Sequence, residues 1–252
     1  MRVDVAFTPA GLAGAEVAGR TVFVVDVLRA STTIAVALAN GARGVIPVAS
    51  IEEAMKLSQT LERREVLLAG ERNATRIAGF DLGNSPLEMT EGTVRGKTLI
   101  TTTTNGTRAL LATTGAAAVY LAAGVNLSVA GARAREALEQ DRDLLVICAG
   151  REGSFGLDDA YTAGRLVSLA LGGRRIRKGL NDAALVSQDL ARRYGVRWLR
   201  PLMASRAGRD LAALGFREDI AIAADEDSYP VLPQFADRRI SLALVPVTET
   251  AP

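Results

Sequence analysis

Histidine is absent from this chain of 252 residues, and cysteine occurs only once, at Cys148. Without histidine, the protein has no phosphohistidine intermediate, no Ser–His or Cys–His dyad and no histidine-rich zinc site. A single cysteine forms no intrachain disulfide and no CxxC site, a pattern typical of proteins of the reducing cytosol. We therefore expect a cytoplasmic protein whose chemistry uses neither histidine nor paired cysteines.

Long apolar runs and long basic runs are missing as well. The first residues, MRVDVAFTPAG, contain an acid at Asp4 and do not have the pattern of a signal peptide, and no segment is long enough to span a membrane. The 30 Lys and Arg residues are nearly balanced by 28 Asp and Glu residues, which are spread among them. These features predict neither a membrane nor a nucleic acid as a partner.

Lysine is scarce, with only Lys56, Lys97 and Lys178, so nearly all positive charge is arginine. Codon bias in a GC-rich genome accounts for this composition without any function. The composition still means that a bound oxyanion must be held by arginine forks or by backbone N–H groups.

Hydrophobic residues make up 48% of the chain, enough to bury a full core in a single domain of residues 1–252 or in two fused halves. Short apolar runs alternate with helical patterns. The predicted strands are Val3–Phe7, Thr21–Val27, Gly44–Val48, Val66–Gly70, Thr98–Thr102, Ala118–Ala123, Leu144–Gly150 and a last one near Ile240–Val245. The predicted helices are Ser31–Asn40, Ile51–Leu61, Thr107–Thr113, Leu127–Glu139, Asp158–Leu171, Asp182–Arg193 and Arg206–Leu214. Continuous apolar strands favour a largely parallel or mixed sheet covered on both faces, a three-layer α/β/α fold.

The chain also shows a pattern of internal repetition between residues of about 20–90 and 97–172. Each segment has the order strand, Thr-rich turn, helix, Gly–Ala, strand, helix, and then a strand ending in AG and charged residues. The two corners are Ala69–Arg72 and Ala149–Glu152. Either a duplication or the shared rhythm of α/β folds produces such a pattern. A duplication would bring matching loops of the two halves together across one cleft.

Two turns each join the carboxyl end of a predicted strand to the start of a helix: DVLRASTT (Asp26–Thr33) and TTTTNGT (Thr101–Thr107). In open α/β sheets, ligands bind outside the carboxyl ends of the strands, and a helix N-terminus offers N–H groups and partial positive charge to an anion. The residues that could donate to an anion or let backbone approach it are Ser31, Thr32, Thr103, Thr104, Asn105, Gly106 and Thr107.

Both turns have a structural alternative, because Ser, Thr and Asn are favoured helix N-caps anywhere. Asp26 favours the functional interpretation, since a carboxylate beside the apolar run FVV is unfavourable unless it is paired or binds a metal. An Asp26–Arg29 ion pair is the structural alternative for this residue.

Two further clusters lie at predicted strand ends. The first, LLAGERNATRIAGFDLGNSPLE, holds the candidate residues Glu71, Arg72, Asn84, Ser85 and Glu88. The second, CAGREGSFGLDDAYTAG, places Asp158 and Asp159 at the start of a helix, where they could simply stabilise its dipole. Alternatively, one of them joins Asp26 and Glu71 in holding Mg²⁺, a hard ion that takes carboxylate, water and phosphate oxygens. Cys148 itself lies in an apolar run and is predicted to be a core residue.

Five motifs, DVLRASTTI, LLAGER, FDLGNSPLE, TTTTNGTRAL and CAG…LDDAYTAG, occur in this order. Together they resemble the 2-phosphosulfolactate phosphatase family of coenzyme M biosynthesis, and the likeness extends from about Val24 to Ile220. This resemblance implies Mg²⁺-dependent hydrolysis of 2-phospho-3-sulfolactate, or of a closely similar small anionic phosphate ester, to the alcohol and phosphate.

We assign roles on this basis. Mg²⁺ is expected on Asp26, Glu71, Asp158 or Asp159, directly or through water, and Arg29 and Arg72 are expected to clamp phosphate or sulfonate. The two turns would cradle the anion, and the remaining candidates would line the pocket. Attack is expected from an activated water or from an aspartate that forms an aspartyl-phosphate.

One hypothesis from another class also fits the sequence. A non-catalytic anion-binding protein, a sensor or a storage module, would use the same cleft without turnover. Metal-dependent phosphate release separates the two hypotheses. For the assembly, a homodimer is the commonest outcome among oligomers.

Overall fold

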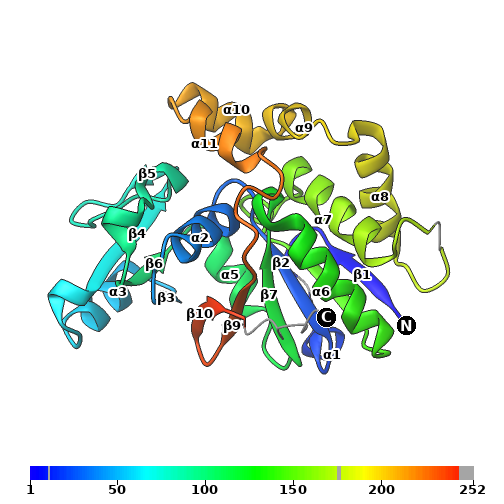
Figure 1. Cartoon of the computed structure of the whole chain (residues 1–252), viewed down its shortest axis with the longest axis horizontal. Coiled ribbons are helices and arrows are strands. Elements are labelled where there is room, and N and C mark those ends of the chain that lie inside the picture. The colour runs from blue at the N-terminus through cyan, green and yellow to red at the C-terminus, as the bar shows by residue number, and fades with distance from the viewer. Residues whose placement is uncertain (11, 175–176, 244–252) are drawn as a thin grey trace, which may run out of the picture.

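Ten strands form one sheet in the computed structural model, which describes residues 1–10, 12–174 and 177–243 (Figure 1). Their order across the sheet is β1-β8-β2-β7-β9-β10-β3-β6-β4-β5. The strands are β1 Val3–Ala6, β2 Thr21–Val25, β3 Gly44–Pro47, β4 Val66–Arg72, β5 Thr75–Arg76, β6 Thr98–Thr102, β7 Ala118–Ala122, β8 Leu144–Cys148, β9 Pro233–Ala236 and β10 Arg239–Leu242.

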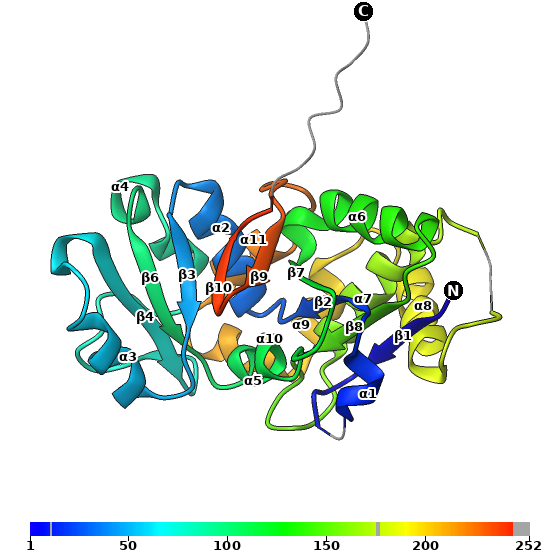
Figure 2. The same cartoon turned by 90° about the horizontal axis from the view of Figure 1, so that it is seen from below.

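Two parallel groups make up most of this sheet, β1-β8-β2-β7 on one side and β3-β6-β4 on the other. The β9–β10 hairpin lies between them and pairs antiparallel with β7 and with β3 (Figure 2). The sheet is therefore mixed but mainly parallel.

Helices cover the sheet, and strand residues alternate between its faces. Phe23 and Val25 of β2 pack into one core with the apolar sides of α6 and α7, whereas Val22 and Val24 pack into another with α2 and α5. The helices are α1 Gly14–Val17, α2 Ala30–Ala39, α3 Ile51–Ser58, α4 Glu91–Val94, α5 Gly106–Leu111, α6 Leu127–Glu139, α7 Leu157–Ala170, α8 Asp182–Tyr194, α9 Leu199–Ala204, α10 Arg206–Ala213 and α11 Arg217–Ala223. The three-layer α/β/α prediction is confirmed.

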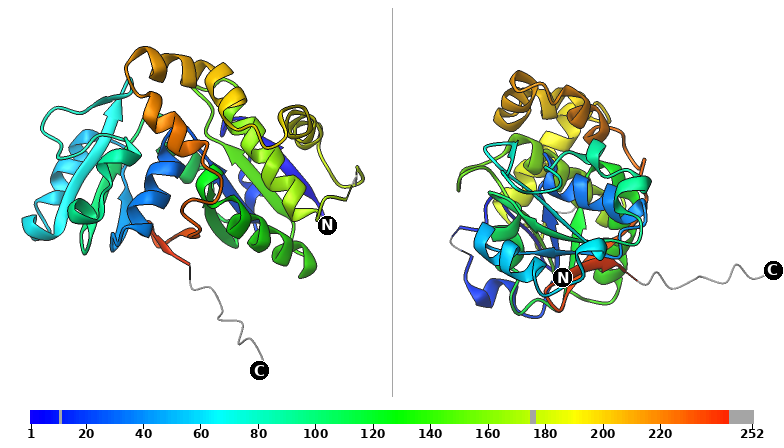
Figure 3. Two further views of the ribbon diagram at one scale, coloured as in Figure 1. Left: turned by 45° about the horizontal axis from the view of Figure 1, so that its top comes forward. Right: turned by 90° about the vertical axis from the view of Figure 1, so that its left-hand side faces the viewer.

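Helices α10 and α11 (orange) lie across the carboxyl ends of the strands (Figures 1 and 3). Leu211 of α10 and Ile220 of α11 anchor them in the same core as β2 and β8. This placement puts a helical cover over the edge of the sheet where the sequence predicts ligand binding. In the part of the chain that the structure describes, no helix has both the length and the apolar character needed to cross a membrane.

The predicted elements agree with the structure to within a few residues, and those at 98–102 and 127–139 agree in full. Strand β4 runs two residues further than predicted, because Glu71 and Arg72 pair with the short strand β5. Helices α1, α4, α9 and α11 were not predicted; each has at most seven residues, too few for a clear helical period. The predicted last strand near 240–245 corresponds to β10, while Val245 lies outside the described residues.

The two segments that resemble each other in sequence are interleaved in the sheet. From the outer side to the centre, one group reads β8, β2, β7 and the other reads β4, β6, β3. The repeat aligns Thr21 with Thr98 and Gly44 with Ala118. In the sheet, Thr21 of β2 pairs with Ala118 of β7, and Thr98 of β6 pairs with Gly44 of β3. Each segment thus places its first strand between two strands of the other. Duplication itself stays a prediction, but this arrangement brings the turns after β2 and β6 together.

Candidate functional site

A cavity of about 120 Å³ opens at the carboxyl edge of the sheet. The corners that follow β2, β4, β6 and β8 all contribute to its lining, and α10 closes it from above. Because parallel strands end at the same edge, side chains far apart in sequence meet here. The sequence-predicted residues that line this cavity are Asp26, Arg29, Glu71, Asn84, Thr103, Thr104, Asn105, Asp158 and Asp159.

Four carboxylates at this cavity, those of Asp26, Glu71, Asp158 and Asp159, are all buried. Burial raises the pKa of Asp26 to about 7, and the negative charges of Glu71 and Asp158 act in the same direction. Burial likewise raises the pKa of Asp158 to about 6 and that of Asp159 well above its ordinary value. The cluster therefore holds more negative charge than its surroundings stabilise, a condition that favours binding of a cation or a proton.

Two of these carboxylates tie loops together. Asp159 accepts hydrogen bonds from the backbone N–H of Val27, at 2.9 Å, and of Gly150, at 3.0 Å. Glu71 accepts from the N–H of Ala74 and of Thr104, both at 2.8 Å. Each carboxylate thus has both oxygens engaged and joins the corners of two different strands.

Asp26 is held by the turn that follows β2. Its Oδ1 accepts from the N–H of Ala30 at 3.2 Å, and its own N–H donates to Oγ of Ser31 at 3.0 Å. Its other oxygen, Oδ2, faces Gly106 at the start of α5, where an added Cβ would lie only 2.9 Å away. Among the described residues, no hydrogen bond reaches Oδ2 of Asp26, which leaves that oxygen open for a ligand.

The residues fit a magnesium ion, although the described part of the chain holds no group of three or more His, Cys, Asp or Glu side chains arranged around one ion position. Magnesium is usually bound by one or two carboxylates, with water and substrate phosphate completing its shell. Asp26 and Asp158 both line the cavity and are the carboxylates whose oxygens are not both engaged by other loops. A donor set of oxygens alone, without histidine or thiolate, matches the preference of this hard ion.

Arg29 lines the cavity, but its charge is already paired. Its guanidinium donates to Asp219 of α11 at 2.6 Å and to the carbonyl of Ala74 at 3.0 Å, and it lies 4.5 Å from the ring centre of Phe216. The side chains of Arg29 and Asp219 are 3% and 1% exposed. The Asp26–Arg29 ion pair, the structural alternative from the sequence, is therefore not formed, because Arg29 pairs with Asp219.

The other predicted residues lie around the cavity without lining it. Arg72 donates to Oγ1 of Thr102 at 3.0 Å and to the carbonyl of Glu71. Two more make local contacts: the hydroxyl of Thr32 donates to the carbonyl of Val27, and Glu88 accepts from the N–H of Gly83. The hydroxyl of Ser85 makes a long-range contact, since it donates to Asp219 of α11.

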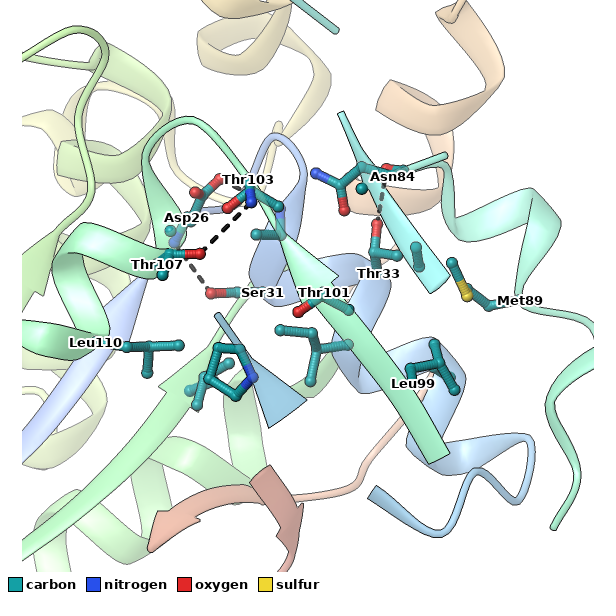
Figure 4. Close-up of a pocket in the computed structure, with 18 of the residues that line it drawn as sticks. Asp26, Ser31, Thr33, Asn84, Met89, Leu99, Thr101, Thr103, Thr107 and Leu110 are labelled. Atoms are coloured by element: carbon teal, nitrogen blue, oxygen red, sulfur yellow. Dashed lines mark hydrogen bonds between the residues drawn. The ribbon is translucent and has the colours of Figure 1, made fainter. Parts of the chain in front are cut away.

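A second, smaller cavity of about 20 Å³ adjoins the first and shares Asp26, Asn84 and Thr103 with it. Ser31, Gly106 and Thr107 belong to this smaller cavity, whose inner end is apolar at Met89 and Leu99 (Figure 4). Figure 4 shows the hydroxyls of Ser31, Thr103 and Thr107 grouped around Asp26. A space of this size holds about one water molecule.

The capping alternative is not observed at either turn. Helix α2 begins after Arg29 and helix α5 after Asn105, and neither has a side-chain N-cap hydrogen bond. In addition, Oγ1 of Thr104 is buried with no hydrogen-bond partner among the described residues. Buried hydroxyls normally have partners, so this donor is available to a ligand.

Sequence reasoning missed four charged residues at the site, among them Glu152, which lines the cavity beside Arg151. Arg151 and Arg206 line the cavity, and Asp219 neutralises Arg29. Arg151 belongs to the AGRE corner, which the sequence marked only as part of the repeat. Arg206 and Asp219 lie in the stretch SRAGRDLAALGFREDI, which shows no motif chemistry by itself. Only the folding of α10 and α11 over the sheet edge brings these residues to the site.

Comparison with known proteins agrees with the motifs. A family model described as 2-phosphosulpholactate phosphatase matches residues 6–238. A protein of Symbiobacterium thermophilum named "Probable 2-phosphosulfolactate phosphatase" is 41% identical over 227 residues, covering 90% of this chain and 96% of its own length. Proteins of the same name from Thermotoga maritima and Clostridium acetobutylicum are 39% and 31% identical; they cover 92% and 95% of this chain and are themselves covered to 94% and 100%.

Proposed function

The chain belongs to the 2-phosphosulfolactate phosphatase family, and from that premise we propose that it hydrolyses 2-phospho-3-sulfolactate to 3-sulfolactate and phosphate with the help of Mg²⁺. It is a phosphoric monoester hydrolase. We place the reaction in sulfonate metabolism of the coenzyme M type and in the cytosol, a setting supported by its one cysteine being a buried free thiol.

The observation that carries the proposal is the convergence of four buried carboxylates and the turn that begins α5, which has no side-chain N-cap hydrogen bond, on one cavity. Carboxylates that repel one another favour binding of a cation, and this cation can in turn bind an anionic substrate. Helix starts and a hydroxyl without a partner provide donors for phosphate oxygens. A purely structural cluster would instead be expected to neutralise its acids with arginines from the same loops.

Asp26 and Asp158 would hold the magnesium ion, with Glu71 and Asp159 ordering the loops around it. When bound, the ion would neutralise charge on the phosphoryl group and polarise its oxygens. The Thr104 hydroxyl and the backbone N–H groups of Asn105, Gly106 and Thr107 would orient the remaining phosphoryl oxygens. These donors come from the turn that Glu71 fixes through its bond to the N–H of Thr104.

Asp26 is the residue we propose for proton transfer or for nucleophilic attack. As a general base, it would take the proton of the attacking water while the P–O bond to the sulfolactate oxygen breaks. As a nucleophile, its free Oδ2 would form an aspartyl-phosphate that water then hydrolyses.

The direct test is phosphate release from 2-phospho-3-sulfolactate by the full chain, with Mg²⁺ and with EDTA. We expect turnover with the ion, loss of turnover with the chelator, and recovery when excess Mg²⁺ is added. Full turnover in EDTA would contradict the metal assignment but keep the phosphatase. Absence of phosphate release with Mg²⁺ on this ester and on 2-phospholactate would contradict the proposed function.

A further inference from the structure

Three arginines line the cavity, and they differ in how their charge is compensated. Arg29 is buried against Asp219 in a one-to-one ion pair at 2.6 Å. Arg151 and Arg206, by contrast, share one carboxylate. An NH2 group of Arg151 lies 2.7 Å from Oδ2 of Asp210, and Nε of Arg206 lies 4.0 Å from the same oxygen. Two guanidinium groups thus share one carboxylate as their ion-pair partner, while Glu152, which also lines the cavity, is exposed and forms no ion pair with them among the described residues.

This arginine pair comes from two separate parts of the fold. Arg151 lies in the corner after β8, and Arg206 is the first residue of α10. Their side chains are 31% and 67% exposed, whereas the carboxylates of the cavity are buried. Both arginines nevertheless line the same cavity as Asp26, Asp158 and Asp159. The pair therefore stands at the rim of the same cavity whose base carries the acids.

The charge distribution suits an ester with two kinds of acidic group. A phosphoryl group can approach the carboxylates only together with a cation, so any further acidic group of the substrate needs a place away from them. Guanidinium groups bind planar and tetrahedral oxyanions in a fork, and they do so best where they are partly desolvated. The rim of this cavity offers two such groups, and their present partner is a single side chain that is itself partly exposed.

We propose that Arg151 and Arg206 form the subsite for the acidic group that is not transferred, the sulfonate, and that Asp210 is the counter-ion which holds the pair when this subsite is empty. The proposal deepens the proposed function and rests on it. The substrate class is then a phosphate monoester with a second strong acid on the neighbouring carbon. The two arginines favour binding of the sulfonate, whereas Asp210 weakens it, because its carboxylate competes with the sulfonate for the arginines.

The kinetic test compares 2-phospho-3-sulfolactate with 2-phospholactate, which keeps the phosphate and the carboxylate but lacks the sulfonate. For Arg151→Gln and Arg206→Gln, we expect KM for the sulfonate ester to rise about 10- to 100-fold, the range of a lost charge-assisted hydrogen bond, with kcat changed much less. The same variants should treat 2-phospholactate nearly as the wild type does. Arg209→Gln, an exposed arginine of α10 outside the cavity, is the matched control and should leave both substrates unaffected.

Asp210→Asn tests the sign of the effect. Removal of the competing carboxylate should lower KM for the sulfonate ester several-fold and leave 2-phospholactate unchanged. A purely structural role for Asp210 predicts the reverse, a lower Tm and a higher KM for both esters. Arg206 is mostly exposed, so its variant gives an answer even if the Arg151 variant is poorly folded.

Equilibrium binding separates this proposal from the proposed function. Calorimetric titration with 3-sulfolactate needs no turnover, and we expect wild type to bind it and both arginine variants to lose about 10-fold or more in affinity. If no ester is hydrolysed but this loss is seen, the subsite stands and the phosphatase proposal fails. If turnover is normal and the variants keep wild-type KM, or lose kcat equally on both esters, the arginines do not read the sulfonate and the subsite is overturned.

Discussion

Asp26 has an environment that few surface carboxylates share. It follows a fully buried strand, its Oδ1 is fixed by one backbone N–H, and its Oδ2 lies against Gly106 of another helix. Burial and the charges of Glu71 and Asp158 raise its pKa to about 7. A side chain in this setting lowers the stability of the free protein near neutral pH. A role of Asp26 in acting on a ligand would account for this loss of stability.

Asp26→Asn should therefore remove turnover while keeping the fold. The amide keeps an oxygen that can accept from the N–H of Ala30, and it removes a poorly solvated charge, so Tm should stay the same or rise. We expect kcat to fall by about 10²- to 10⁴-fold, as for the loss of a general base, or further if Asp26 is the nucleophile. Thermal unfolding and phosphate release are measured on the same sample. A large fall in Tm with kcat preserved in the folded fraction would favour a structural role.

The raised pKa values also predict how stability depends on pH when the metal is removed. Between pH 4 and 7, Asp26 binds more protons in the folded state than in the unfolded state, where its pKa is near 3.8. The free energy of unfolding must then decrease as the pH rises through this window. Asp158 acts in the same direction up to about pH 6. Arg29 opposes the pKa shift of Asp26, and Arg151 opposes that of Asp158, but each does so only in part.

Urea unfolding in EDTA at pH 5 and pH 7.5 measures this dependence. We expect the wild type to lose more stability than Asp26→Asn over the interval, by on the order of 1–4 kcal/mol. The difference between the two proteins measures the contribution of Asp26 together with its effect on Asp159, whose pKa the charge of Asp26 also raises. Equal pH slopes in the two proteins would mean that the pKa of Asp26 is not raised in the fold.

At the scale of elements, the site depends on how closely α5 approaches the turn after β2. Gly106, the first residue of α5, has no room for a side chain: a Cβ would lie 2.9 Å from Oδ2 of Asp26 and 3.0 Å from Cβ of Ala30. The glycine thus allows the start of one helix to touch the start of another. Gly106 and Ala30 both line the smaller cavity, which shares Asp26 with the larger one.

Gly106→Ala should displace Asp26 and reduce kcat more than it reduces stability. We expect at least a 10-fold fall in kcat, because small displacements of a reacting group have large effects on rate. Gly92→Ala is the matched control, since Gly92 also lies in the first turn of a short helix but has no atom within 4 Å of the added Cβ. Circular dichroism and kinetics of both variants give the comparison. Equal kcat values for the two would show that the close approach has no role in catalysis.

Helix α11 contributes to the same site through one contact. Asp219 accepts from Arg29 and from the hydroxyl of Ser85, so a buried acid of the helical cover joins the corner after β2 to the segment between β5 and α4. Buried pairs of this kind are costly to break, because the remaining charge has no partner. The cover is thus attached to the catalytic loops and not merely laid over them.

At the scale of the whole molecule, the cavity spans both parallel groups of the sheet. Asp26, Asp158 and Asp159 come from the β1-β8-β2-β7 group, whereas Glu71 and the turn after β6 come from the β3-β6-β4 group. Within the sheet, the β9–β10 hairpin is what connects these groups, and Ile240 of β10, fully buried, pairs with Val45 of β3. The geometry of the site therefore depends on a strand pair that contributes no residue to the lining of the cavity.

Ile240→Ala should lower the free energy of unfolding by about 2–4 kcal/mol, the range for removing a large aliphatic side chain from a core. Leu242→Ala, in the same strand but 47% exposed, should change it by less than about 0.5 kcal/mol. Urea denaturation of both variants, followed by kinetics at a temperature where each is folded, measures the effect. If the two variants were equally stable, the hairpin would not be a packed part of the core.

The sequence by itself determined the elements and the chemistry of the site. Apolar runs and helical periods gave nearly every longer strand and helix, because local patterns report which side of an element is buried. The absence of histidine, together with acids and Thr-rich turns at strand ends, indicated an oxygen-lined anion site, and Asp26, Glu71, Asp158 and Asp159 do share one cavity. These residues could be found because each follows an apolar strand directly, and parallel strands end at one edge.

Only the tertiary structure decided the partners of the charged residues. Arg29 and Arg72 looked alike in sequence, yet one faces Asp219 in the cavity and the other turns to Thr102. Arg151 and Arg206 gave no signal, because their role depends on α10 crossing the sheet edge more than 50 residues after β8. The pairing of the charged residues is set by long-range packing. It is also set by the position of each segment's first strand between two strands of the other segment. No local pattern encodes either one, since the energy of a charge pair depends on distance and burial and not on separation along the chain.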